Sequence, residues 1–156
     1  MDEKKFEIKY TLYSQMLFNI CYGYTKSKNE SEDLLQNIFL KYLKCNKSFK
    51  SLDDEKYWLI RVTINECKNF IKLGYKRKEI FDFEKISNSP SQQNNEIAIL
   101  KRTIDLLDEK YKAVIILYYY ESLNIFEIAN ALNISISSVK KRLERARNKL
   151  KQLMEV

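Results

Sequence analysis

The chain has 156 residues, 45% of them apolar, but only two glycines and one proline. This composition allows a buried core and supplies few residues for helix breaks or the tight turns of a sheet, so the sequence predicts an all-α protein. The net charge of +7 favours a polyanionic partner, either nucleic acid or an anionic membrane surface. The absence of histidine, of a glycine-rich phosphate loop and of any CxxC pair argues against an enzyme, so we expect no catalytic residue, no cofactor and no metal.

The N-terminal residues MDEKKFEIKY lack the apolar core of a signal peptide, and no apolar run approaches the ~20 residues of a membrane span. We therefore expect a cytoplasmic protein without membrane insertion. The three cysteines, Cys21, Cys45 and Cys67, lie far apart in the sequence. We expect them to be free and mostly buried thiols.

Three helices are predicted in the first half of the chain, because apolar residues recur there at spacings of three or four. They run over about 3–25, 29–43 and 53–72. Asn29 followed by Glu32 predicts a capping box at the start of the second helix. Asp53 or Asp54 is expected to cap the third, after a polar loop.

The helical pattern disappears between residues 79 and 96. This stretch contains SNSPSQQNNE, a polar run with the single proline, and is typical of an interdomain linker. We therefore expect two small helical domains, 1–78 and 97–156, joined by a flexible linker over 79–96.

The helical period restarts at Ile97, and Asp108 is a candidate cap for the next helix. Asn124 and Glu127 predict a capping box that opens a short helix ending at Leu132. A last helix is predicted from Ser135 to about residue 153.

The segment NIFEIANALNISISSVKKRLERARNKL predicts a helix-turn-helix. Ala129 is small, as required where two short helices cross closely. Asn133 tolerates the left-handed conformation that the turn needs, and Ser135 is placed to cap the second helix. An inner apolar stripe of that helix is formed by Val139, Leu143, Ala146 and Leu150.

The last helix is strongly basic, with seven Lys or Arg and two Glu from residue 135 onward. Its outward positions suit contacts with base edges and phosphates in a major groove. The candidate DNA-binding residues are Ser137, Ser138, Lys140, Lys141, Glu144, Arg145 and Arg147.

Three motifs in order resemble the extracytoplasmic-function (ECF) type of the sigma-70 family of RNA polymerase sigma factors. They are ESEDLLQNIFLKYLK (30–44), WLIRVTINECKNFIK (58–72) and LLDEKYKAVIILYYYESLNIFEIANALNISISSVKKRLERARNKL (106–150). The resemblance covers about residues 8–152. It implies a region 2 helical bundle followed by a region 4 helix-turn-helix. It also implies a protein that directs core RNA polymerase to promoters by reading −35 and −10 elements and helping to melt DNA.

The resemblance also implies partners and roles. The first motif would dock on the β′ coiled coil of core RNA polymerase through Glu32, Asp33 and Gln36, and region 4 would contact the β flap. The family suggests an anti-sigma factor as a further partner, and a monomeric free protein is expected.

The second motif lies where the family reads and melts the −10 element. A polar stripe at 4-3-4 spacing there suits phosphate contacts and an exposed base edge. Its residues are Arg61, Asn65, Lys68 and Lys72. Phe49 stands in the loop that, in the family, captures a flipped base, whose extrusion costs a few kcal/mol.

The sequence departs from the family pattern in places. Asn37 stands where an acidic residue is usual, and Ser137 where glycine is common. Lys141 and Glu144 occupy readout positions that vary within the family, so the resemblance does not transfer a promoter sequence.

Two other classes of protein fit the helix-turn-helix. A regulator that acts without polymerase would need a dimerisation surface to match a two-fold operator. A helical interaction protein with an incidental basic face would bind no nucleic acid. A monomer on sizing favours the sigma factor over the dimeric regulator.

Overall fold

The computed structural model describes residues 1–81 and 95–155, and every regular element within these ranges is helical. The elements are α1 (Glu3–Thr25), α2 (Lys28–Lys44), α3 (Leu52–Phe81), α4 (Asn95–Asp105), α5 (Glu109–Ile115), the π-helix η3 (Ile116–Tyr120), α6 (Ile125–Leu132) and α7 (Ile136–Met154). The prediction of an all-α protein is confirmed. None of the helices in these ranges is both long and apolar enough to cross a membrane.

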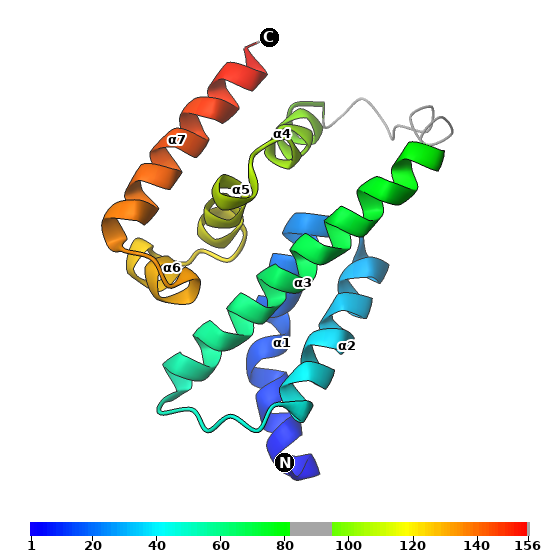
Figure 1. Cartoon of the computed structure of the whole chain (residues 1–156), viewed down its shortest axis with the longest axis vertical. Helices are drawn as coiled ribbons and strands as arrows, with labels where there is room; N and C mark the ends of the chain where they lie inside the picture. Colours follow the sequence, from blue (N-terminus) through cyan, green and yellow to red (C-terminus); the bar gives the residue numbers. More distant parts are fainter. Residues whose placement is uncertain (82–94, 156) are drawn as a thin grey trace.

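The first three helices form an N-terminal bundle in which each helix packs on the other two (Figure 1). Helix α1 covers the predicted range, and the Asp2 side chain caps it by accepting a hydrogen bond from the Lys5 amide at 2.8 Å. The three helices meet along apolar stripes at helical spacing, which explains why they fold together. Fully buried side chains of this core include Leu17, Ile20, Ile38, Leu59 and Ile60.

Two predicted helix starts are wrong. The Ser27 hydroxyl accepts from the Glu30 amide at 3.3 Å, so α2 begins at Lys28 and the predicted Asn29 box lies inside the helix. Likewise, the Ser51 hydroxyl accepts from the Asp54 amide at 3.1 Å, and α3 begins at Leu52. In both places a serine slightly upstream takes the capping role that was assigned to a later polar residue.

Helical structure also reaches both ends of the predicted linker. Helix α3 continues beyond Lys72 to Phe81, and α4 begins at Asn95. The central part of the predicted linker, residues 82–94, lies outside the described residues.

The C-terminal domain consists of α4 to α7, and its helix-turn-helix matches the predictions closely. Asn124 and Glu127 form the capping box, with side chain to amide distances of 2.8 and 3.2 Å. Asn133 is left-handed, with φ 58° and ψ 47°, and the Ser135 hydroxyl accepts from the Ser138 amide at 3.0 Å. Asp108 stands at the start of α5, but its side chain makes no capping bond.

All three cysteines are free thiols, as predicted. Cys21 and Cys67 are buried in the N-terminal core, and Cys45 is half-buried at the end of α2.

A buried carboxylate joins the three N-terminal helices. Glu55 of α3 is only 6% exposed. Its Oε1 accepts from Lys9 Nζ at 2.7 Å and from the Tyr13 hydroxyl at 2.9 Å, both on α1. Its Oε2 accepts from the Tyr42 hydroxyl of α2 at 2.7 Å. Burial acts to raise the pKa of Glu55, but the three donors outweigh it and hold the pKa below its usual value.

Replacing this carboxylate should destabilise the fold in a pH-dependent way. We expect Glu55→Gln to lower the free energy of unfolding by about 1–3 kcal/mol at pH 7, because hydrogen bonds to a charged group are lost. Since the folded pKa lies below the unfolded one, this stabilisation is complete above the unfolded value near 4.3 and is lost as pH falls through the folded pKa.

The measurement is urea unfolding at pH 7 and at pH 3.5. The exposed Glu7→Gln serves as a control that should change stability little at either pH. An equal deficit of Glu55→Gln at both pH values would contradict the assigned ionisation.

Candidate nucleic-acid interface

The outer face of α7 is accessible in the folded chain. Ser137, Lys140, Lys141 and Glu144 are exposed. The opposite face of the helix is buried at Val139, Leu143 and Ala146 against α4, α5 and α6. Helix α7 lies on the side of the C-terminal domain that faces away from α1 to α3 (Figure 1). The predicted groove-reading face is therefore free of the N-terminal domain.

Ser138, also predicted to contact DNA, belongs to the start of α7. Its hydroxyl lies 2.9 Å from the Ser135 hydroxyl and its amide donates to the same oxygen. The side chain is half-buried, so its main contact in this structure is the helix cap.

The two predicted arginines lie on opposite flanks of α7. Arg147 donates from Nε to the Tyr119 hydroxyl at 3.0 Å, and its guanidinium lies 5.3 Å from the centre of the Tyr118 ring. Arg145 lines a hollow beside Leu106 and Tyr111 of the opposite flank. Arg147 is thus held in one orientation by aromatic side chains that the sequence reasoning did not connect to it.

The α3 stripe divides into two parts. Asn65 and Lys72 are exposed and Lys68 is half-buried. Arg61 instead contacts the C-terminal domain, where its Nε donates to the carbonyl of Ala131 at 2.9 Å and its Nη2 to the carbonyl of Asn130 at 3.2 Å. The first residue of the stripe, Arg61, is therefore hydrogen-bonded to α6, whereas the later residues lie exposed or half-buried on the surface of α3.

The loop between α2 and α3 is attached to α3 by aromatic contacts. Phe49 is half-buried, with its ring centre 5.6 Å from that of Trp58. Lys47 Nζ lies 5.7 Å from the centre of the Trp58 ring. Trp58 thus belongs to the predicted Phe49 site, and its position in the second turn of α3, close to the loop in the sequence, was the available signal.

The predicted polymerase-binding residues share one exposed face of α2. Glu32, Asp33 and Gln36 are exposed, whereas Leu35 and Ile38 between and beyond them are buried in the bundle. Gln36 lies three residues after Asp33 and four after Glu32, and these spacings place it beside both acidic side chains on the helix surface.

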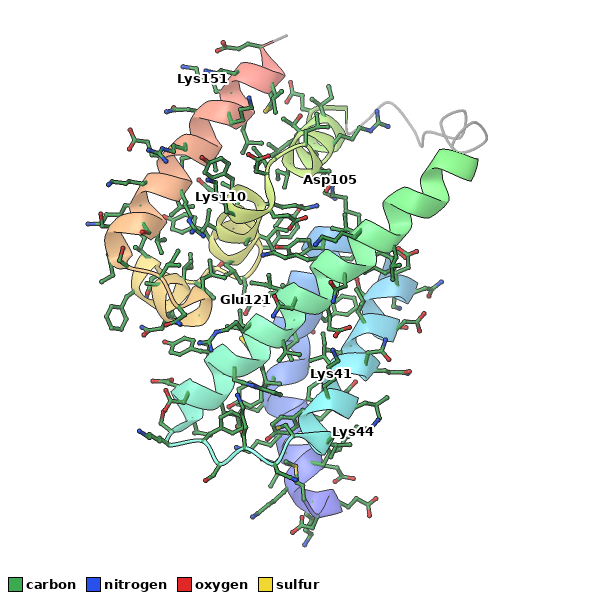
Figure 2. The ribbon with its side chains drawn as sticks, viewed as in Figure 1. Lys41, Lys44, Asp105, Lys110, Glu121 and Lys151 are labelled. Carbon is green, nitrogen blue, oxygen red and sulfur yellow. The ribbon has the colours of Figure 1, made fainter. Side chains whose placement is uncertain are left out.

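Contacts between the two domains were not foreseen from the sequence. Asn19 Nδ2 donates to Glu121 Oε2 at 3.1 Å, and Lys56 Nζ lies 2.9 Å from Glu127 Oε2. Lys26 pairs with Asp105. Asp105 and Glu121, labelled in Figure 2, lie on the side of the C-terminal domain that faces the N-terminal bundle.

Gly23 of α1 was an overlooked signal for this contact. A Cβ at this position would lie 3.0 Å from Ile116 Cγ2 and 3.3 Å from Tyr120 Cγ, both in η3. A lone glycine inside a helical pattern often marks such a close approach.

Comparison with known protein families agrees with this two-domain arrangement. The model of sigma-70 region 2 matches residues 10–75, and the model of sigma-70, region 4 matches residues 97–150. The ECF RNA polymerase sigma factor SigM of Bacillus subtilis (strain 168) is 30% identical over 153 residues, covering 92% of this chain and 91% of that protein. The chain belongs to the sigma-70 family.

Another relative of this sigma factor is the ECF RNA polymerase sigma factor SigX of Bacillus subtilis (strain 168). It is 26% identical over 166 residues, covering 99% of this chain and 86% of SigX. These relatives establish an alternative sigma factor of the ECF type, which binds core RNA polymerase and promoter DNA and directs transcription initiation without being an enzyme.

Two solved structures share the fold of this sigma factor, each with a TM-score of 0.70. One is the sigma factor RpoE in complex with the anti-sigma factor NepR from Bartonella quintana, 23% identical and covering 98% of both chains. The other is CnrH in complex with the cytosolic domain of CnrY, 20% identical and covering 99% of this chain and 90% of that one.

The left-handed turn of the helix-turn-helix gives a direct stability test. Asn133→Ala should lower the free energy of unfolding by about 1–2 kcal/mol, because alanine disfavours the positive φ that the turn requires. Asn133→Gly is the matched control and should cost less, because glycine adopts this conformation freely. Thermal unfolding of both variants measures the difference, and an alanine variant as stable as the glycine variant would contradict the role of the turn.

Proposed function

We propose that this sigma factor reads the −35 element with α7 and the −10 element with α3 and the loop before it. The exposed outer face of α7 carries the proposal, because it presents lysines and a glutamate at groove-facing positions of a helix-turn-helix. Within that face we assign base contacts to Ser137, Lys141 and Glu144. Arg147 is better placed for a phosphate, because Tyr119 fixes it on the flank.

At the −10 element, we assign an extruded base to the neighbourhood of Asn65 and the Phe49–Trp58 pair. Stacking on aromatic rings offsets the free energy lost when a base leaves the DNA stack, and an exposed amide can form hydrogen bonds with the edge of that base. Lys68 and Lys72 follow on the same stripe and suit phosphates of the same strand.

For core polymerase, we assign the β′ coiled-coil contact to the α2 face formed by Glu32, Asp33 and Gln36, and the β-flap contact to the C-terminal domain.

We further propose a cytoplasmic protein, monomeric when free, whose activity is controlled by an anti-sigma factor. The complexes of RpoE with NepR and of CnrH with CnrY support such a partner. A regulator that acts without polymerase is disfavoured, because the region 2 match covers residues 10–75.

The decisive experiment is in vitro transcription with core RNA polymerase on a genomic promoter library. We expect the chain to select a distinct promoter class.

Asp33→Arg should abolish most of this transcription and weaken binding to core polymerase in a pull-down, because it reverses charge at the centre of the α2 face. Glu7→Arg, an equal charge reversal at an exposed position of α1, is the control and should remain active. If Asp33→Arg bound core polymerase with unchanged affinity, the assignment of the polymerase contact to α2 would be wrong.

On α7, a residue that reads a base and a residue that contacts a phosphate should respond differently to replacement by alanine. Lys141→Ala should relax preference at one −35 position and cost about 1–3 kcal/mol in promoter affinity. Lys151→Ala, near the C-terminal end of the helix, should weaken binding to all sequences alike and lower the salt slope by about one. Promoter selection with each variant at two salt concentrations measures both effects. A Lys141→Ala variant with unchanged sequence preference would show that another face of α7 enters the groove.

A further inference from the structure

We propose that Tyr119 and Arg147 together bind one backbone phosphate of promoter DNA beside the −35 element. In this site the Tyr119 hydroxyl contacts the phosphate directly and also positions Arg147. The inference rests on the proposed reading of the −35 element by α7, and it adds a residue of η3, which precedes the helix-turn-helix, to that contact.

The hydrogen bond between the two side chains leaves donors free for an anion. Arg147 Nε donates to the Tyr119 hydroxyl oxygen at 3.0 Å. Because that oxygen accepts, the hydroxyl hydrogen is available to donate elsewhere. The N–H groups on the two terminal nitrogens of the guanidinium are not used by Tyr119 either. A phosphate placed against both side chains therefore accepts a hydrogen bond from each, and bonds between charged groups of this kind are the strong ones.

Aromatic packing fixes the plane of the guanidinium before DNA arrives. Arg147 Cζ lies 5.3 Å from the centre of the Tyr118 ring and 5.8 Å from that of the Tyr119 ring. The two rings meet edge to face, with their centres 4.9 Å apart and an angle of 74° between their planes. A long side chain that is already ordered loses less conformational freedom when it binds, so this arrangement favours phosphate binding.

The site is accessible and its positive charge is not neutralised. Tyr119 is 55% exposed, and Arg147 is exposed as well. In the part of the chain that the structure describes, no carboxylate forms an ion pair with Arg147. A neutral hydroxyl and two rings hold the guanidinium instead, so its full charge is left for a partner. An anion with several acceptor oxygens, such as a phosphate, fits this chemistry.

The position of the site on α7 favours the DNA backbone as the source of this anion. Arg147 follows Lys140 by seven residues, about two helical turns, so the two basic side chains share one stripe. This stripe flanks the face that we assign to base contacts. A helix in the major groove lies between two sugar-phosphate strands, so its flanks meet phosphates. Tyr119 extends the basic flank outward from the helix.

Promoter DNA with single uncharged phosphates tests the site. The protein is the sigma factor bound to core RNA polymerase, and the DNA is a promoter selected in the transcription experiment. In a series of duplexes, one phosphate at a time beside the −35 element is replaced by a neutral methylphosphonate. The variants are Tyr119→Phe, which keeps the ring and removes the hydroxyl, and Arg147→Ala. Tyr10→Phe, at another exposed tyrosine on α1, is the matched control.

We expect Tyr119→Phe to bind the unmodified promoter about fivefold more weakly than wild type. Its sequence preference should be unchanged, because a phosphate contact carries no information on the base. Arg147→Ala should bind more weakly still and lower the salt slope by about one. The methylphosphonate at one position should weaken wild type markedly and both variants less, because the lost interaction is the same. Tyr10→Phe should match wild type on every duplex.

Three outcomes would overturn the site. The first is an unchanged affinity of Tyr119→Phe for the promoter. The second is a loss of affinity in Tyr119→Phe that adds fully to the loss from every methylphosphonate, because the hydroxyl would then act on the fold and not at a phosphate. The third is weaker binding of Tyr119→Phe to core polymerase in the absence of DNA, which would assign the pair to a carboxylate of the polymerase.

The same materials separate this inference from the proposed function. If the wild-type protein with core polymerase selected no promoter, the proposed function and the phosphate site would fail together. If it selected a promoter and Tyr119→Phe bound that promoter as well as Tyr10→Phe does, the phosphate site alone would be rejected.

Discussion

The Glu55 carboxylate is the interaction on which the geometry of the N-terminal domain depends. It lies at the start of α3 and accepts hydrogen bonds from α1 and α2, so it fixes the rotation of α3 about its own axis. With that rotation set, Trp58 faces the preceding loop and Arg61 faces α6. One buried charge, neutralised by its donors, thereby orients both the candidate base-binding loop and the surface that meets the second domain.

Local rules explain why the helix-turn-helix could be predicted from sequence. The capping box at Asn124, the left-handed Asn133 and the Ser135 cap each depend on residues within about four positions. The starts of α2 and α3 were harder to predict, because several polar residues stood close together and any of them could cap. Ser27 and Ser51 take those roles, each hydroxyl accepting a hydrogen bond from the amide three residues on, and spacing alone does not decide between such neighbouring candidates.

The contact between the domains could not be read from periodicity. Its pairs join residues far apart in the chain, with separations of 102 for Asn19–Glu121, 71 for Lys56–Glu127 and 70 for Arg61–Ala131. Arg61 illustrates the difficulty: its helical spacing placed it correctly on one stripe with Asn65 and Lys72. That spacing carried no information on whether the stripe meets nucleic acid or a neighbouring helix.

The π-helix η3 determines which of its side chains face α1 and which face α7. Its wider turn, closed by the Glu121 amide donating to the Ile116 carbonyl at 3.3 Å, presents Ile116 and Tyr120 to α1 while Tyr119 meets Arg147 of α7. An ordinary α-helical turn has one residue fewer, and each residue of an α-helix turns the chain by about 100°. Losing a single residue here would rotate everything downstream by about 100°, so this one turn fixes the orientation of α7 relative to the face of η3 that packs on α1.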